Sequence, residues 1–219
     1  MTAALPEGPI TVGIRSLEVR WIFPGQLEHA VAGWFGRFPA EAESREDTYL
    51  RTPALRGLSV KIRAGRALEV KVRRGSPGTL DVAGRARGWM ESWQKWSFPF
   101  APLSQEGTDP PGWRPVAKKR RISRFSLVSG GIVAGGPGAA GNPVCAVELT
   151  EVRTGGEAWW SLGFEATGPG GLLRSVLEAT AGVVFAQALP AGVELGMGDS
   201  TSYAEWLHRW PDASQGTSA

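Results

Sequence analysis

The stretch LSVKIRAGRALEVKVR, residues 58–73, decides the fold. From 58 to 63 and again from 68 to 73, apolar side chains stand at the even positions and polar or charged ones at the odd positions. A period of two places alternate residues on opposite faces of a strand, and the intervening turn Ala64-Gly65-Arg66 suits a hairpin. These residues therefore predict two antiparallel strands, each with one apolar face and one charged face.

The same alternation recurs elsewhere along the chain. Residues 10–23 set Leu17, Val19 and Trp21 opposite Glu18 and Arg20, which predicts another strand of this kind. Further strands are predicted at 48–50 after a polar stretch, at 122–128 after a basic loop (117–121), and at 144–152 and 158–166. Helical spacing predicts helices at 27–38, 84–96 and 172–189 and a short one from Tyr203, while proline and glycine predict loops at 101–116 and 130–143.

The charged faces of these strands are expected to point inward. A single strand with a charged face most often turns that face to water. Here several long strands share the pattern, and the chain also supplies helices that can cover the apolar faces. A sheet closed into a barrel would then hold the charges in its lumen. Lysine and arginine bind phosphate oxygens and carboxylates hold a divalent cation, so the pattern favours a polyphosphate site.

Composition excludes several other classes of protein. With 42% hydrophobic and 21% charged residues the chain is typical of a folded domain, and a net charge of +3 does not require nucleic acid. One cysteine, Cys145, excludes an internal disulfide, and two histidines, His29 and His208, leave little material for a histidine site. No signal sequence or membrane-length apolar run is seen, so we expect a cytoplasmic protein. We expect one domain over 1–210 and a disordered tail over 211–219.

Three motifs resemble those of the CYTH, or triphosphate tunnel, superfamily. Residues 47–53 (DTYLRTP) and 57–63 (GLSVKIR) are similar to its pattern D-x-Y-F-D-T-P … G-x-x-L-R-x-R, and LEVK at 68–71 is similar to its next strand. Residues 201–207 (TSYAEWL) are similar to its closing K-S-Y-x-E-L-L. The chain resembles a divergent member of this superfamily. The resemblance implies an α+β fold, a closed antiparallel β-barrel of about eight strands with helices packed outside.

The chain departs from the family pattern where a metal would bind. The opening E-x-E-x-K of the family corresponds to SLEVR at 16–20, and a later E-x-E corresponds to GFE at 163–165. The closing lysine corresponds to Thr201. Arginine can bind phosphate as lysine does, so Arg20 is a mild change, but the absence of two carboxylates predicts weaker binding of a divalent cation.

The resemblance implies divalent-metal-dependent hydrolysis of a triphosphate or a related phosphoanhydride, with Mg²⁺ or Mn²⁺ polarising the phosphoryl group. The expected catalytic residues are Glu18, Glu165 and Lys71. The expected metal ligands are Glu18, Glu148 and Glu165. The residues expected to bind the substrate are Arg20, Lys61, Arg63, Lys71, Arg73 and Arg124.

Two other functions remain open on the sequence. One is a repurposed enzyme that acts on an organic diphosphate or another anionic substrate in a tryptophan-lined tunnel. The other is a non-catalytic polyphosphate-binding protein. Trp89, Trp93 and Trp96 are interpreted as a helix face that covers the barrel, with an aromatic wall for an organic substrate as the alternative. The expected partner is an anionic, phosphorylated small molecule rather than a membrane or nucleic acid.

Overall fold

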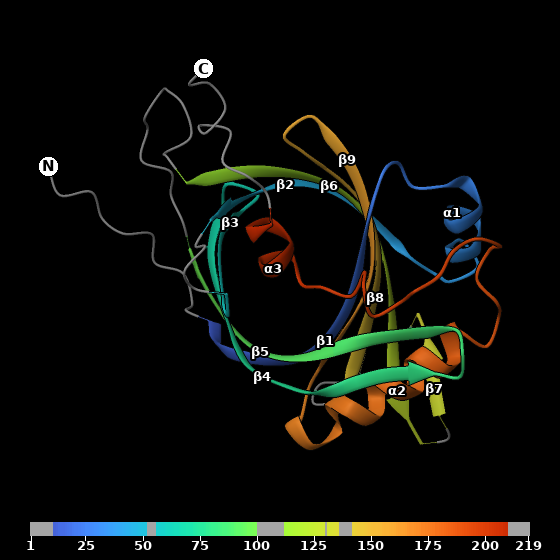
Figure 1. The fold of residues 1–219 in the computed structure, drawn as a ribbon. Coiled ribbons are helices and arrows are strands. Elements are labelled where there is room, and N and C mark those ends of the chain that lie inside the picture. Colours follow the sequence, from blue (N-terminus) through green and yellow to red (C-terminus); the bar gives the residue numbers. More distant parts are fainter. Residues whose placement is uncertain (1–10, 52–55, 100–111, 130, 136–141, 210–219) are drawn as a thin grey trace, which may run out of the picture.

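The structure is a computed structural model that describes residues 11–51, 56–99, 112–129, 131–135 and 142–209. Within these ranges the chain forms a closed antiparallel barrel of eight strands (Figure 1). This is the fold class that the sequence predicted. The tail predicted to be disordered, 211–219, lies outside the described residues.

The barrel is closed by two strands that are far apart in the sequence. The eight barrel strands are β1 (Thr11–Pro24), β2 (Glu41–Leu50), β3 (Leu58–Arg63), β4 (Ala67–Val82), β5 (Ala86–Pro99), β6 (Trp113–Val128), β8 (Val144–Thr154) and β9 (Glu157–Thr167). Their order in the sheet is β2-β3-β4-β5-β1-β9-β8-β6, and β2 also pairs with β6 to complete the ring. The short strand β7 (Gly131–Ala134) extends the sheet at one end of β6.

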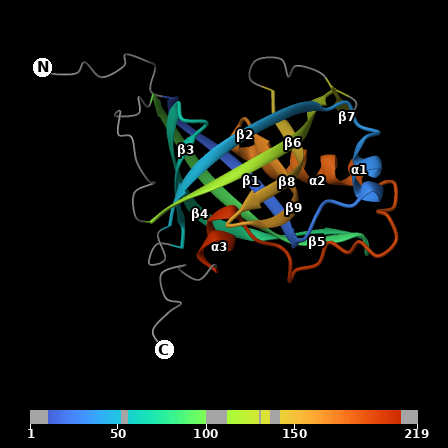
Figure 2. The same ribbon diagram turned by 90° about the horizontal axis from the view of Figure 1, so that it is seen from above.

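Apolar residues on the outer face of the barrel form the main core. Two helices, α1 (His29–Phe35) and α2 (Leu173–Val184), cover this face and lie at one side of the barrel in Figure 2. Trp21 of β1 is fully buried there, and its ring meets those of Phe164 and Phe185 edge-on at 6.3 and 6.5 Å. Aromatic pairs in this geometry add to the stability that burial provides. The outer face therefore carries the packing and leaves the inner face free for polar residues.

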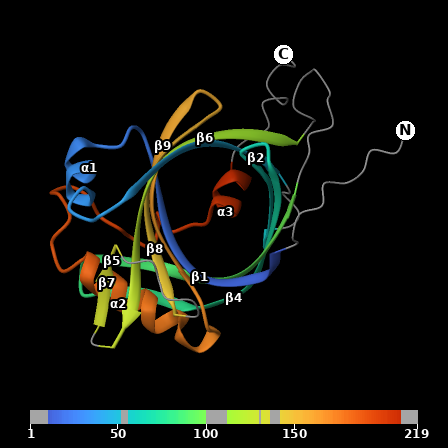
Figure 3. The same cartoon turned by 180° about the vertical axis from the view of Figure 1, so that it is seen from behind.

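A third helix, α3 (Tyr203–His208), lies within the ring of strands in both axial views (Figure 1 and Figure 3). Ser202 caps it, because the Ser202 hydroxyl accepts a hydrogen bond from the backbone N–H of Glu205. Trp206 and Leu207 pack in a second buried cluster, against inward-facing apolar residues such as Val116 and Val152. Helix α3 thus fills one end of the barrel, whereas the sequence placed all helices outside.

Several predictions of secondary structure are wrong. Residues 86–99 form strand β5 where a helix was predicted over 84–96, and β2 begins at Glu41, before the strand predicted at 48–50. The basic run 117–121 and residues 113–116 belong to β6 rather than to loops, and residues 131–134 of the predicted loop 130–143 form β7. The other part of the predicted loop at 101–116 lies mostly outside the described residues. No helix in the described part of the chain is long and apolar enough to cross a membrane.

Candidate functional site

The interior of the barrel holds two cavities, of about 440 and about 400 Å³. The lining of the larger contains ten lysine or arginine residues and six glutamates. Burial, reinforced by Lys61, lowers the pKa of Lys118 well below its ordinary value, and even without this charge the basic residues outnumber the glutamates. The two cavities share five lining residues, Arg20, Arg63, Arg120, Glu148 and Glu165. The lumen is therefore a polar chamber with an excess of basic side chains.

The residues of the decisive hairpin line this chamber. Lys61, Arg63, Lys71 and Arg73 all border the larger cavity, as the alternation of β3 and β4 predicted. Lys61 Nζ lies 3.2 Å from a carboxylate oxygen of Glu69, and Arg63 donates to the same carboxylate at 3.1 Å. Burial opposes the ionisation of Glu69, but Lys61, Lys95 and Arg63 outweigh it and lower the pKa of Glu69 to about 2.

A second network joins β1, β6 and β8 across the lumen. Arg20 lies 3.3 Å from Glu148 and donates to the Ser161 hydroxyl at 3.1 Å, and its guanidinium lies 4.6 Å from the ring centre of Tyr203. Arg120 forms a close ion pair with the other oxygen of Glu148. Burial opposes the ionisation of Glu148, but Arg20 and Arg120 hold the pKa of this carboxyl well below its ordinary value.

The expected catalytic residues form a third group. Glu18 of β1 and Glu165 of β9 are paired directly across the two strands. Lys71 Nζ forms a close ion pair with Glu18 and lies 3.9 Å from Glu165. Burial raises the pKa of Glu18, and the nearby charge of Lys71 offsets only part of this rise. For Lys71, burial alone would lower the pKa, but Glu18 and Glu165 outweigh it and raise the pKa. The structure therefore brings Glu18, Glu165 and Lys71 together.

Arg73 and Arg124 lie at the edges of the site. Arg73 pairs with Glu91 at 3.0 Å beside α3. Arg124 borders the smaller cavity, where its half-exposed side chain pairs with the exposed Glu41 at 2.6 Å. Five of the six predicted phosphate-binding residues thus share the larger cavity, and Arg124 is separated from them.

The three predicted metal ligands do not fit a divalent cation in this arrangement. Each carboxylate is already paired with a basic side chain: Glu18 and Glu165 with Lys71, and Glu148 with Arg20 and Arg120. Within the described ranges, no three histidine, cysteine, aspartate or glutamate side chains gather closely enough to hold a metal ion.

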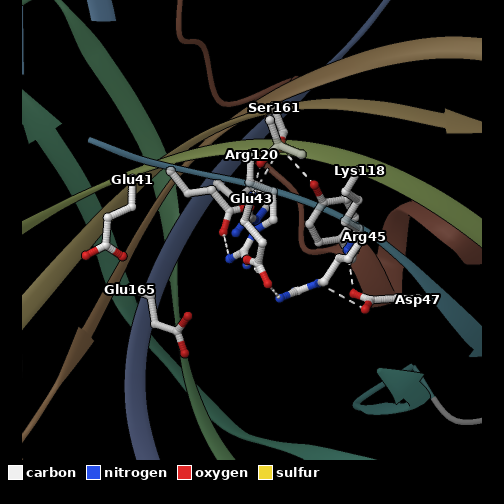
Figure 4. A network of polar contacts seen from close by, with 12 residues as sticks. Glu41, Glu43, Arg45, Asp47, Lys118, Arg120, Ser161 and Glu165 are labelled. Carbon is white, nitrogen blue, oxygen red and sulfur yellow. Dashed lines mark hydrogen bonds and ion pairs between the residues drawn. The ribbon is translucent and has the colours of Figure 1, made fainter. Parts of the chain in front are cut away.

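Several lumen residues were not predicted as part of the site. Lys118 donates to the Tyr49 hydroxyl at 2.6 Å and lies 3.9 Å from the ring centre of Tyr203. Figure 4 shows Arg45 reaching Asp47 on β2 and Arg120 on β6 close by, with Glu165 to one side of this network. Lys118 and Arg120 lie at the same parity on β6 as the predicted Arg124, and that period of two was the signal that could have revealed them.

Two of the tryptophans border the same cavity. Because 89 and 93 differ by an even number, a strand presents both side chains on one face, and Trp89 and Trp93 line the larger cavity. Trp93 is buried, whereas Trp89 is half exposed. Trp96 has the opposite parity and packs near Gly13. The predicted helix face is replaced by an aromatic wall of two residues.

Comparisons with known proteins find few similarities. No protein-family model matches the chain, and no curated protein matches it significantly. Among solved structures it is similar to a conserved hypothetical protein from Pyrococcus furiosus, at 16% identity over 86% of this chain and 98% of that chain, with a TM-score of 0.44. It is also similar to an S. pombe RNA triphosphatase, at 10% identity over 81% of this chain and 80% of that chain, with a TM-score of 0.35. Neither similarity reaches the level that assigns a family or a function.

Proposed function

We propose that the barrel binds a triphosphate or a related polyphosphate group of a small molecule in its lumen. The observation that carries this proposal is the larger cavity, whose lining holds ten lysine or arginine residues against six glutamates. A polyphosphate carries several negative charges on closely spaced oxygens, and guanidinium and ammonium groups bind such oxygens through charge-assisted hydrogen bonds. A confined chamber also keeps bulk water from screening these contacts.

Lys95 offers the sharpest test of anion binding. It lines the larger cavity, and no carboxylate of the described residues lies within salt-bridge distance of it, since its contacts with Glu69 and Glu165 are of longer range. Replacing it by Gln therefore removes a lumen charge without leaving a close carboxylate unpaired. Replacing most of the other basic residues in the lumen would leave a buried carboxylate without its partner, and a loss of binding could then come from damage to the fold.

The experiment is a calorimetric titration with inorganic tripolyphosphate. We expect binding at low salt that weakens as salt rises, and a loss of about tenfold in affinity for Lys95→Gln, which corresponds to about 1.4 kcal/mol. Arg87→Gln is the matched control, because Arg87 pairs with Asp81 on the exposed outside of the barrel. No binding at low salt, or equal affinities for the two variants, would contradict the proposal.

Hydrolysis of the bound phosphoanhydride is a second candidate, favoured by the group formed by Glu18, Glu165 and Lys71. A carboxylate can take a proton from an attacking water, while an adjacent ammonium offsets charge on the phosphoryl group. Release of inorganic phosphate from tripolyphosphate and organic triphosphates, measured in EDTA and with Mg²⁺ or Mn²⁺, tests this reaction. Glu18→Gln should abolish release while tripolyphosphate still binds. If phosphate release stayed at the background rate in every buffer while tripolyphosphate still bound, the protein would be a binding protein and not a hydrolase.

A further inference from the structure

We propose that Lys71 and Arg20 stand in for a divalent metal in this lumen, so that the protein binds its polyphosphate ligand as a metal-free anion. This inference rests on the proposed function, because it concerns the form of the ligand that the same cavity accepts. It departs from the metal dependence that the sequence resemblance implied. Three observations carry it.

The first is the position of Lys71 between two facing carboxylates. Glu18 and Glu165 are cross-strand partners on β1 and β9, a placement in which two like charges destabilise a sheet. Lys71 reaches them from β4, forms a close ion pair with Glu18 and lies 3.9 Å from Glu165. Its side chain is largely buried, and the two glutamates raise its pKa, so the ammonium stays charged. A protein cation therefore occupies the place where the pair could have held a metal.

The second observation is the space that Gly163 leaves for Arg20. The two residues face each other on β1 and β9, and a Cβ atom at position 163 would lie 2.7 Å from the guanidinium carbon of Arg20. The guanidinium fills the room of a missing side chain and from there reaches Glu148 and Ser161. The position at which the family pattern has a carboxylate is thus taken by an arginine.

The third observation is the balance of charge around Glu148 and in the lumen as a whole. Arg20 and Arg120 each pair with one oxygen of Glu148, so this third carboxylate is engaged on both sides. A divalent cation would have to displace tethered cations that cannot diffuse away, in a cavity where basic residues already exceed acidic ones. Coulomb repulsion at a few ångströms in a partly buried site opposes this displacement. A metal-free polyphosphate is the complementary ligand.

The test compares two titrations of the unmodified protein with tripolyphosphate, one in EDTA and one with excess Mg²⁺. We expect binding in EDTA and a several-fold weaker apparent affinity with Mg²⁺, because the metal neutralises part of the ligand's charge. Binding that requires Mg²⁺, or that Mg²⁺ strengthens tenfold, overturns this inference and leaves the proposed function standing. Absence of binding in both buffers overturns the proposed function and this inference together.

A second measurement follows the metal directly. Electron paramagnetic resonance of Mn²⁺ should detect no tight site in the unmodified protein, and a stoichiometric micromolar site would overturn the inference. Lys71→Gln frees Glu18 and Glu165, so this variant should gain Mn²⁺ binding and lose about tenfold in metal-free affinity for tripolyphosphate. Lys71→Arg keeps the charge and should show neither change. The titrations of the unmodified protein decide the matter even if Lys71→Gln fails to fold.

Discussion

Arg20 and Gly163 depend on each other at the level of single atoms. The Arg20 guanidinium lies over Gly163 because position 163 has no side chain, and it is held there by Glu148, Ser161 and the Tyr203 ring. The sequence resemblance predicted a missing carboxylate at 163, and in the structure the Arg20 guanidinium fills the space that a side chain at 163 would need. Restoring a glutamate at 163 alone would drive Arg20 out, so the two positions must be changed together.

We expect Gly163→Ala to reduce the free energy of tripolyphosphate binding by more than it reduces the free energy of unfolding. The added methyl group meets the far end of a flexible side chain, so Arg20 can swing away at modest cost, but it then leaves its place in the lumen. A loss of three- to tenfold in affinity is expected by calorimetry. In an Arg20→Met background the same substitution should have little further effect, because there is no guanidinium left to displace. Additive effects of the two changes would show that they are not coupled.

The sequence predicts a strand well when one of its faces is apolar and the other polar. It predicts a strand poorly when this alternation is missing. Strands β1, β3, β8 and β9 alternate clearly, and the structure has them where the sequence predicted them, whereas β4 continues to Val82, well beyond the predicted residues 68–73. Only the end of β2, residues 48–50, was predicted, because charged residues occupy both of its faces between Glu41 and Asp47. Strand β5 was assigned as a helix because a spacing of four residues puts Trp89 and Trp93 on one face of either element. Contacts between strands that are far apart in the chain, such as that of Arg20 with Gly163, cannot be predicted from a single sequence.

The barrel wall and the helix that covers it should respond in opposite ways to the same substitution. In β5, a Cβ atom at Gly88 would lie 2.7 Å from a Val19 methyl and 2.8 Å from the ring of Trp21, both buried. Gly88→Ala should therefore destabilise the protein by about 1–3 kcal/mol. In α2, Gly182 has open space around it, so Gly182→Ala should stabilise by about 0.5–1 kcal/mol through helix propensity.

Urea unfolding followed by tryptophan fluorescence measures both changes. Because the two substitutions add the same single carbon, they serve as controls for each other. If Gly88→Ala proved neutral, the close packing of β5 against β1 would be in question. If Gly182→Ala proved destabilising, position 182 would have to be packed rather than open.

At the scale of the whole molecule, the barrel holds many charged side chains inside, and this determines how its stability responds to acid. Five carboxyl groups on the inner face or beside it have lowered pKa values, because neighbouring basic residues outweigh the effect of burial: Glu43, Asp47, Glu69, Glu148 and Glu165. Glu18 has the opposite shift, since burial raises its pKa. Acidification therefore removes the contributions of five carboxylates to the stability of the fold and relieves the cost of burying one charged carboxylate, Glu18.

The sign of the pH dependence follows from these directions. A carboxyl group with a lowered pKa in the folded state stabilises the fold fully above its unfolded pKa, and this stability is lost as the pH falls toward the folded value. For Glu69 the window runs from 4.5 down to about 2, and the contribution is roughly 3 kcal/mol. We expect the free energy of unfolding to fall steeply as the pH drops below about 5. Glu69→Gln should be less stable at neutral pH and should lose less on acidification, because one of the titrating groups is gone. A free energy of unfolding that stays level from neutral pH to pH 3 would mean that the lumen carboxylates do not depend on their basic partners, and the charge pairing described for the barrel would be wrong.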